Sequence, residues 1–375
     1  VSEVGRRLKL LHPAVTTILV AGTNGKGSTC EYLERFAMAN GLSVGKSTSP
    51  HIHHFNERIA IDGVPVPDQS IVRAFQEIES ARKEITLTYF EFATLASLFL
   101  FCEQNVDVAI LEVGLGGRLD AMNIVDPDLT IITHISLDHQ DWLGNTRAEI
   151  AREKAGIMRA GVSCIVADRD PPESVYEYAL EIGASLYIIG RDFESLEDID
   201  TVLPRDSFDA AQQASKMLGW DVSGSEEIGV TTRLTGRRTV IKDKCEVLLD
   251  VAHNPAAAAS LAEHLRAHWD GRDIHAVIGM YKDKDIESVS GILMPLFKTC
   301  HLTNLDEPRG EDADRILGRL SVKPAGNVET YVNIEDALDG ARKEASPADL
   351  ILVCGSFPVV SGVLQLLSQT ALTKN

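Results

Sequence analysis

The chain has 375 residues, of which 44% are hydrophobic and 24% are charged, so it has the length of two ordinary globular domains. Its formal net charge of −19 argues against nucleic-acid binding, because such binding relies on a basic surface. No apolar run approaches the ~18 residues of a membrane span, and no charged and then apolar leader opens the chain, so we expect a cytoplasmic protein that binds no membrane.

The first half of the chain alternates short β-branched runs with longer amphipathic stretches, a pattern typical of a mostly parallel sheet with intervening helices. The first predicted strand is Thr17–Val20, and a helix is predicted over Cys30–Asn40, closed by Gly41. Further strands are predicted from continuous hydrophobicity at Val108–Val113, Leu129–Ile135, Ser163–Ala167 and Leu186–Ile189.

A second set of strands and helices occupies the C-terminal part. A helix over Phe208–Leu218 and a polar stretch of low periodicity over residues 224–238 separate the two sets. We therefore expect one domain over residues 1–235 and a smaller one over residues 236–375. The second set comprises predicted strands at Glu246–Val251, His275–Met280, Cys300–Leu305 and Leu350–Cys354, and helices at Ala256–His268 and Ile334–Ala345. The six scattered cysteines lack a C-x-x-C pair and are expected to be reduced core residues.

A glycine-rich stretch, A-G-T-N-G-K-G-S at residues 21–28, lies between the first strand and its helix. The backbone N–H groups and the helix dipole at such a turn attract phosphate, and Lys26 would reach the β- and γ-phosphates of a nucleotide. The stretch resembles the Walker A loop, but it departs from it at Val20 and by Gly27 between Lys26 and Ser28. The alternative is a glycine-rich turn that binds no nucleotide.

Polar residues follow several predicted strands at the carboxyl edge of the sheet, where ligands bind in open α/β folds. Glu112 ends the apolar run V-A-I-L-E, and a buried glutamate is rare unless it is paired or bound to a metal. Ser49 in S-T-S-P-H and His139 in S-L-D-H-Q-D-W would join it there. These ligand types suit a divalent ion, although imidazole is unusual for magnesium. For His139 alone, a structural role is the alternative.

Other polar residues have plain structural alternatives. Lys154 in R-E-K-A-G-I lies on a predicted helix, where spacing alone favours an exposed lysine paired with a carboxylate. Glu57 and Arg58 in F-N-E-R-I are expected to form a solvated pair after a Ser-Pro turn. Asp250 and His253 in L-L-D-V-A-H-N-P follow a buried strand and precede a helix, so Asp250 either belongs to a site at this edge or caps that helix.

Taken together and in this order, these stretches resemble the folylpolyglutamate and dihydrofolate synthases of the Mur ligase superfamily. The matching stretches are G-T-N-G-K-G-S, T-S-P-H with N-E-R-I, T-Y-F-E-F at Thr88 to Phe92, E-V-G-L-G-G-R-L-D-A at Glu112 to Ala121, D-H-x-D-W-L-G, R-E-K-A-G-I and D-V-A-H-N-P. The resemblance spans nearly the whole chain, and T-Y-F-E-F with E-K-A-G-I favours the folate branch over the peptidoglycan branch. It implies an α/β fold, with an N-terminal P-loop ATPase domain on a mostly parallel sheet and a smaller C-terminal Rossmann-like domain.

The resemblance also implies roles for individual residues. The implied ATP contacts are Thr23, Asn24, Gly25, Lys26, Gly27, Ser28, Asp209, Arg237, Asp250 and His253. The implied magnesium ligands are Ser49, Glu112 and His139, with Ser28 serving a second ion. The implied pterin-lining residues are Thr88, Tyr89, Phe90, Glu91, Leu119, Asp120 and Ala121. Lys154 matches a lysine that is carbamylated in the family. The chain departs from the family at Asp209, where asparagine is usual, at Met122, where threonine is usual, and in a short segment over Phe193–Ser207.

The activity implied by the resemblance is that of an ATP-dependent acid–amino-acid ligase, with Lys26, Lys154 and His139 as catalytic residues. It would add L-glutamate to dihydropteroate, to the glutamate tail of a reduced folate, or to both, through an acyl phosphate. The implied cofactors are ATP and Mg²⁺, with K⁺ as a further candidate, and we expect a monomer that binds only small-molecule substrates. The alternatives are another Mur-type ligase acting on a cell-wall precursor, and a regulatory module whose ATP turnover drives a conformational switch.

Overall fold

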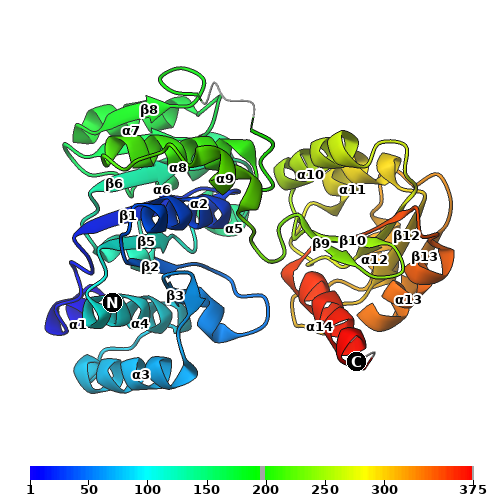
Figure 1. The fold of residues 1–375 in the computed structure, drawn as a ribbon, viewed down its shortest axis with the longest axis horizontal. Helices are drawn as coiled ribbons and strands as arrows, with labels where there is room; N and C mark the ends of the chain where they lie inside the picture. Colours follow the sequence, from blue (N-terminus) through cyan, green and yellow to red (C-terminus); the bar gives the residue numbers. More distant parts are fainter. Residues whose placement is uncertain (195–198, 374–375) are drawn as a thin grey trace. The chain divides into compact units, whose positions relative to one another are not determined.

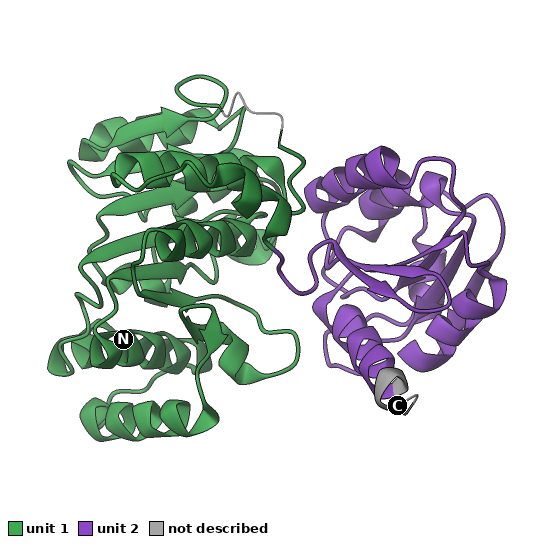
Figure 2. Ribbon diagram, in the orientation of Figure 1, with its two compact units in different colours: residues 1–232 green, residues 233–375 purple. Residues whose placement is uncertain are grey.

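The computed structural model describes residues 1–194 and 199–373 and divides into two compact units, Val1–Thr232 and Arg233–Asn375 (Figures 1 and 2). The sequence-based boundary between residues 235 and 236 lies close to this division. Residues 195–198, part of the segment that the sequence marks as short, lie outside the description.

The first unit is built on an eight-stranded sheet of order β4-β3-β2-β5-β1-β6-β7-β8. The strands from β2 to β8 in this order run parallel, and β3 and β4 add an antiparallel edge. The strands are β1 (Thr16–Ala21), β2 (Val44–Ser47), β3 (Ile59–Ile61), β4 (Val64–Pro65), β5 (Val108–Glu112), β6 (Leu129–Ile132), β7 (Ser163–Val166) and β8 (Ser185–Ile188). The continuous apolar runs of β1, β5 and β6 therefore correspond to strands buried in the centre of the sheet.

Helices connect these strands, and α2 and α8 pack side by side (Figure 1). The helices are α1 (Ser2–Arg7), α2 (Lys26–Ala39), α3 (Asp68–Arg82), α4 (Tyr89–Gln104), α5 (Gln140–Leu143), α6 (Arg147–Ala155), α7 (Glu173–Ile182), α8 (Arg205–Met217) and α9 (Ser225–Thr231), with 3-10 turns η1 (Phe55–Arg58) and η2 (Ala121–Ile124). Two expectations are wrong. The helix after β1 begins at Lys26 rather than Cys30, and α9 occupies part of the stretch expected to lack periodicity.

The second unit has a six-stranded sheet of order β13-β12-β11-β14-β10-β9, parallel except for β9. Its strands are β9 (Thr239–Lys242), β10 (Glu246–Leu249), β11 (Ile274–Ile278), β12 (Thr299–Thr303), β13 (Val328–Tyr331) and β14 (Leu350–Cys354). Its helices are α10 (Pro255–His268), α11 (Ile286–Leu293), α12 (Ala313–Gly318), α13 (Ile334–Glu344) and α14 (Phe357–Thr373), with a 3-10 turn η3 (Met294–Leu296). Two α/β units on mostly parallel sheets confirm the predicted fold class.

Each unit has its own apolar core on its own sheet. All six cysteines are free, and all except Cys102 are buried, which confirms that they are core residues rather than a disulfide framework. Within the described parts of the chain, no helix has both the length and the apolar character needed to span a membrane.

Candidate functional site

The glycine-rich loop joins β1 directly to α2. Gly25 caps α2 with a φ of 88°, a left-handed conformation that favours glycine. A Cβ on Gly22 would lie 1.7 Å from Thr133 Oγ1, so the close approach of the Thr133 side chain also requires glycine here. Lys26 is the first residue of α2, and its Nζ donates to the carbonyls of Gly22 and Thr23 at 3.1 and 3.2 Å. The start of a 14-residue helix thus presents its N–H groups and one lysine amine at the same place.

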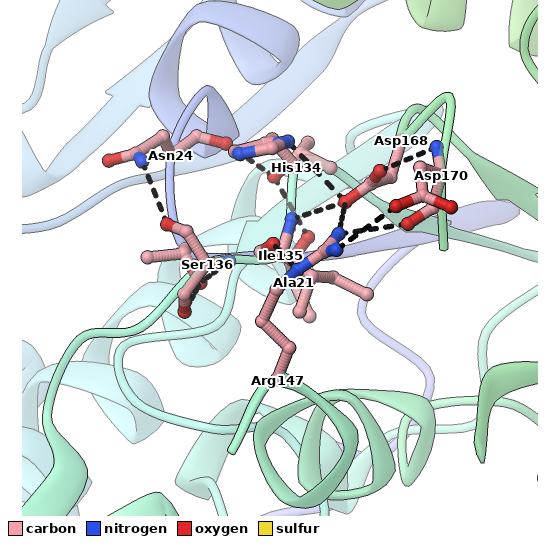
Figure 3. Close-up of polar contacts among 10 residues, drawn as sticks. Ala21, Asn24, His134, Ile135, Ser136, Arg147, Asp168 and Asp170 are labelled. Atoms are coloured by element: carbon pink, nitrogen blue, oxygen red, sulfur yellow. Dashed lines mark hydrogen bonds and ion pairs between the residues drawn. The ribbon is translucent and has the colours of Figure 1, made fainter. Parts of the chain in front are cut away.

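The segment that follows β6 supports this loop (Figure 3). The Thr23 N–H donates to the His134 carbonyl at 2.8 Å, and the Ser136 N–H donates to Thr23 Oγ1 at 3.1 Å. Asn24 Nδ2 donates to Ser136 Oγ at 3.3 Å. Two of the expected ATP contacts, Thr23 and Asn24, are therefore held in place by the neighbouring strand end.

Asp168, which follows β7, in turn fixes that segment (Figure 3). Its Oδ2 accepts from the Ile135 N–H at 2.8 Å and from Arg147 Nη2 at 3.2 Å, and lies 3.4 Å from His134 Nδ1. Burial acts to raise the pKa of Asp168, but the hydrogen bonds, led by that from His134, outweigh it and hold the pKa below its usual range. Sequence reasoning missed Asp168 and Arg147, although Asp168 follows a predicted strand at the edge where Glu112 and His139 were found.

Lys154 lies on α6 and is only 3% exposed, so the alternative of an exposed lysine is wrong. Its Nζ donates at 2.9 Å to the Gly22 carbonyl, which also accepts from Lys26. Burial, followed by the nearby charge of Lys26, lowers the pKa of Lys154 to about 7. A large fraction of this amine is therefore neutral near neutral pH.

Glu112 ends β5 at the carboxyl edge of the sheet and is 5% exposed. Its Oε2 accepts from the Ser49 N–H at 3.0 Å. Val20 of β1 is its register partner, so the carboxylate lies beside the strand that leads into the loop. His139 follows β6 at the same edge and is exposed. The structure thus brings Ser49 to Glu112 and leaves His139 accessible to a ligand.

Glu57 and Arg58 do not form the expected solvated pair. The Glu57 carboxylate accepts three backbone N–H bonds from residues 52–54 at 2.7 to 2.9 Å. Burial acts to raise the pKa of Glu57, but these backbone donors outweigh it and lower the pKa. Arg58 Nε donates to His51 Nδ1 at 2.8 Å. The pair therefore holds the chain that follows Ser49 and belongs to the architecture of the site.

The T-Y-F-E stretch begins α4. Thr88 and Glu91 form a reciprocal capping box, in which Glu91 N–H donates to Thr88 Oγ1 at 3.3 Å and Thr88 N–H donates to Glu91 Oε2 at 2.7 Å. Tyr89 is 62% exposed, and the Arg58 guanidinium lies 5.6 Å from its ring centre. A hollow between α3 and α4 is lined by Tyr89, Phe92, Val72, Phe75, Gln76, Glu79 and Ser80.

The L-D-A stretch lies after β5, close to the same helix. Phe90 packs so tightly on Gly114 that a Cβ there would lie 2.5 Å from its ring. Asp120 accepts two backbone N–H bonds at 2.9 Å each, and burial raises the pKa of its carboxyl group. Leu119 is 79% exposed, whereas Ala121 is buried. Of these side chains, Tyr89 and Leu119 are the ones most open to a ligand.

Asp209 lies on α8 and is 2% exposed, and its Oδ1 forms an ion pair with Arg205 Nε at 2.8 Å. Burial raises the pKa of this carboxyl group. Ser207, at the start of the same helix, donates from Oγ to the Gly25 carbonyl at 3.3 Å. Helix α8 thus touches the loop through Ser207, whereas Asp209 has a partner on its own helix.

In the second unit, Asp250 follows β10 and binds backbone rather than a helix end. Its Oδ2 accepts from the Arg238 N–H at 3.1 Å and its Oδ1 from the Ala252 N–H at 2.9 Å. The cap of α10 is Asn254, which accepts from the Ala257 N–H at 2.9 Å. The alternative that Asp250 caps this helix is therefore wrong.

Arg237 and His253 converge on the ring of Phe357 at the start of α14. The Arg237 guanidinium lies 5.0 Å from the ring centre, and the His253 ring lies 6.3 Å away. His253 Nδ1 is 2.7 Å from the Val251 carbonyl oxygen, which orients the imidazole. Arg237, His253 and Phe357 therefore lie together, and Asp250 binds the backbone of Arg238, the residue after Arg237.

The chain is similar to known proteins over nearly its whole length. Residues 20–241 match the Mur ligase middle domain, and residues 236–357 match the Mur ligase glutamate ligase domain. A dihydrofolate synthase/folylpolyglutamate synthase of Escherichia coli K12 is 40% identical, over 98% of this chain and 90% of its own length. The structure of E. coli FolC in complex with DHPP and ADP has a TM-score of 0.94 at 38% identity, covering 99% of this chain and 92% of that one. The bifunctional synthase of Yersinia pestis complexed with AMPPNP and Mn ion has a TM-score of 0.92 at 37% identity, covering 98% and 92%.

Proposed function

Because this chain belongs to the Mur ligase family, and within it to the dihydrofolate synthase/folylpolyglutamate synthases, we propose that it joins L-glutamate to dihydropteroate and to the glutamate tail of a reduced folate, using ATP. It would then combine dihydrofolate synthase and tetrahydrofolate synthase activities in one site. The observation behind this proposal is that the buried Lys154 amine shares the Gly22 carbonyl with Lys26, at the base of a glycine-rich loop that opens a helix.

The residues at this edge fit a nucleotide with a divalent ion. The N–H groups at the start of α2 and the Lys26 amine suit phosphate oxygens. Ser49, Glu112 and His139 offer a hydroxyl, a carboxylate and an imidazole for Mg²⁺, and Ser28 offers a hydroxyl for a second ion. When bound, Mg²⁺ neutralises the charge that builds up on the transferred phosphoryl group.

The chemistry begins from a poor acyl donor, because an amine that attacks a carboxylate would have to expel oxide. Transfer of the γ-phosphoryl group of ATP to the pterin-linked carboxylate replaces that oxide with a phosphate leaving group. Lys26 and the loop N–H groups position and neutralise the phosphoryl oxygens, which is most of what such a transfer requires. The amine of L-glutamate then forms the C–N bond, phosphate leaves, and the amine loses a proton.

Lys154 is proposed to act as a carbamate. The neutral amine attacks carbon dioxide, an N–C bond forms as one C=O π bond opens, and a proton leaves the nitrogen, so a neutral amine becomes an anionic carbamate. Burial and a pKa of about 7 support this reaction, because only the neutral amine is nucleophilic. The product would add a second carboxylate to an edge that already holds Glu112.

Contacts from the remaining segments complete the proposal. Arg237, Asp250 and His253 are proposed to contact ATP. The support is that Arg237 and His253 converge on Phe357 and that Asp250 accepts from the backbone of Arg238, the residue after Arg237. The segments Thr88–Glu91 and Leu119–Ala121 are proposed to line the pterin site, supported by the exposure of Tyr89 and Leu119. For Asp209, an ATP contact would compete with its ion pair to Arg205.

The test is a phosphate-release assay with dihydropteroate and tetrahydrofolate in parallel, each with and without L-glutamate and Mg²⁺. Release is expected only when ATP, Mg²⁺, one pterin-linked acid and L-glutamate are all present. Glu112→Gln keeps the shape of the side chain but removes its charge, so turnover should fall by far more than ~10-fold. Equal release without the pterin acid would instead support an ATP-driven module, and turnover of a cell-wall precursor would support another Mur-type ligase.

A further inference from the structure

A second buried polar cluster lies in the second unit and has no part in the mechanism above. Its members are His275 of β11, His301 of β12 and Glu344 at the end of α13. Both histidines are 1% exposed, and the Glu344 side chain is 31% exposed. One nitrogen or oxygen atom from each residue lies within 4.8 Å of the other two.

The hydrogen bonds around His301 decide which of its nitrogens carries the proton. The Tyr331 hydroxyl donates its one proton to Glu329, so its oxygen is left to accept from His301 Nδ1 at 3.1 Å. In the neutral imidazole only one of the two nitrogens carries a proton. Its Nε2 therefore carries a lone pair, and this atom lies 3.5 Å from Glu344 Oε2.

The hydrogen bonds of His275 are also arranged so that one ring nitrogen faces a carboxylate and the other faces the cluster. Its Nε2 lies 3.3 Å from Asp349 Oδ2. The same Oδ2 accepts from the Ser346 N–H at 2.7 Å, and an ionised carboxylate can only accept. In the neutral ring, Nε2 is therefore the donor and the lone pair lies on Nδ1, which is 3.8 Å from Glu344 Oε2.

Two imidazole lone pairs and one carboxylate thus converge on a single place. The Thr299 hydroxyl lies beside both nitrogens, 2.8 Å from His275 Nδ1 and 3.2 Å from His301 Nε2. A hydroxyl has one proton and cannot donate to both nitrogens at once. At least one buried lone pair is left without a donor, whereas a cation at the centre would satisfy both nitrogens and the carboxylate together.

The distances agree with such a cation. The separations of 3.5 and 3.8 Å from Glu344 Oε2 to the two nitrogens are too long for good hydrogen bonds. Bonds of about 2.1 Å to a tetrahedral zinc ion place neighbouring ligand atoms about 3.4 Å apart. The outer nitrogens of both rings are also held, by Asp349 and Tyr331, which is how histidine ligands are usually oriented.

We propose that His275 Nδ1, His301 Nε2 and Glu344 bind a divalent transition-metal ion of the zinc type, with the Thr299 hydroxyl beside the fourth position. Two imidazoles and one carboxylate suit zinc and its neighbours, whereas Mg²⁺ prefers oxygen ligands alone. The ion ties β11 and β12 to α13, so it stabilises the second unit and takes no part in glutamate transfer.

The test is a Zn²⁺ titration of the full-length protein, stripped of metal and held in excess Mg²⁺, against a chromogenic chelator. One Zn²⁺ per chain is expected to bind and to raise the melting temperature of the protein. Co²⁺ in place of Zn²⁺ should give the intense visible absorption of a tetrahedral site. Failure of the folded protein to bind Zn²⁺, or a Co²⁺ spectrum typical of six oxygen ligands, would overturn the proposal.

Matched variants locate the ion. Glu344→Gln and His301→Ala should each weaken Zn²⁺ binding by at least about 10-fold. His268→Ala is the matched control and should not change Zn²⁺ affinity. Its ring and that of His264 also lie close together in this unit, with their ring centres 4.2 Å apart. Glu112→Gln should also leave Zn²⁺ affinity unchanged, because Glu112 belongs to the other unit. Unchanged affinity in Glu344→Gln, which removes only a charge from a partly exposed side chain, would contradict the site even if His301→Ala failed to fold.

Discussion

Two buried lysines of the first unit have opposite electrostatic surroundings. Lys46 on β2 forms ion pairs with Glu31 and Glu34 of α2, whereas Lys154 on α6 donates to the Gly22 carbonyl and has no ion pair within residues 1–194 and 199–373. Burial acts to lower the pKa of both. For Lys46 the two carboxylates outweigh burial and raise the pKa, whereas the pKa of Lys154 falls to about 7. The partners of a buried lysine therefore decide its charge, and burial alone does not.

This difference in pKa gives the two lysines different roles. Lys46 remains a cation whose role is to neutralise two carboxylates between a strand and a helix. Lys154 has a neutral form at neutral pH, next to the glycine-rich loop, and so it can act as a nucleophile towards carbon dioxide. A substitution at Lys154 should consequently lower turnover, whereas a substitution at Lys46 should lower the free energy of unfolding.

The largest expected effect is on catalysis at Lys154. Lys154→Met keeps most of the side-chain volume but cannot form a carbamate, so turnover in the phosphate-release assay should fall by more than about 100-fold, or about 2.7 kcal/mol of barrier. Lys154→Ala should lose activity as well and recover part of it with added acetate, which replaces the missing carboxylate. Lys46→Met is the control and should keep its turnover per folded molecule. A fully active Lys154→Met protein would show that the amine plays no part in turnover.

The next effect is on stability at Lys46. Lys46→Met leaves Glu31 and Glu34 buried without their partner, and breaking a buried ion pair in this way costs about 3–5 kcal/mol of unfolding free energy. Urea unfolding measures this loss. Adding Glu34→Gln should restore part of it, because the variant then buries one charge fewer. A loss below about 1 kcal/mol would mean that water reaches the pair and that Lys46 is not the structural counterpart of Lys154.

The same two positions show how far the sequence alone could predict this fold. The strands found from sequence, such as β1, β5 and β10, are continuous apolar runs buried within a parallel sheet. Strand β2 was missed because its residues are V-G-K-S. Gly45 is required because a Cβ would lie 2.4 Å from the Phe101 ring, and Lys46 is tolerated because α2 supplies two carboxylates. Both reasons are tertiary and have no local signal.

The sequence also predicted only part of the candidate site. Strand ends predicted the loop and Glu112 at one sheet edge, whereas the role of Lys154 was predicted only from the family resemblance. The burial of Lys154 could not be predicted, because spacing along α6 does not report what packs on it. The supporting role of Asp168 was missed for the same reason, since its partners Ile135 and Arg147 are distant in sequence.

The smallest effect is a difference in pH dependence. Between the folded pKa of Lys154, about 7, and its unfolded value of about 10.4, the unfolded chain holds a proton that the folded chain lacks. Stability contributed at Lys154 therefore rises with pH in this window, by up to about 1.4 kcal/mol per pH unit. The raised pKa of Lys46 has the opposite sign, so its contribution is fully present below the unfolded pKa and is lost only as pH rises through the folded pKa.

The check is the difference in unfolding free energy between the wild type and Lys154→Met, measured in buffer free of carbon dioxide from about pH 7 to 9. This difference should shift in favour of the wild type as pH rises. For the wild type against Lys46→Met, it should stay level over the same range. A level result at Lys154 would mean that its amine keeps its proton in the folded protein.

The most direct test of the central claim is ¹³C NMR of the full-length protein equilibrated with ¹³C-bicarbonate. The neutral lysine should react and the ion-paired one should not, so a carbamate resonance is expected in the wild type and in Lys46→Met. It should be absent from Lys154→Met. No carbamate resonance in the wild type, or one that persists in Lys154→Met, would contradict the assignment of Lys154 as the carbamylated lysine of a glutamate ligase.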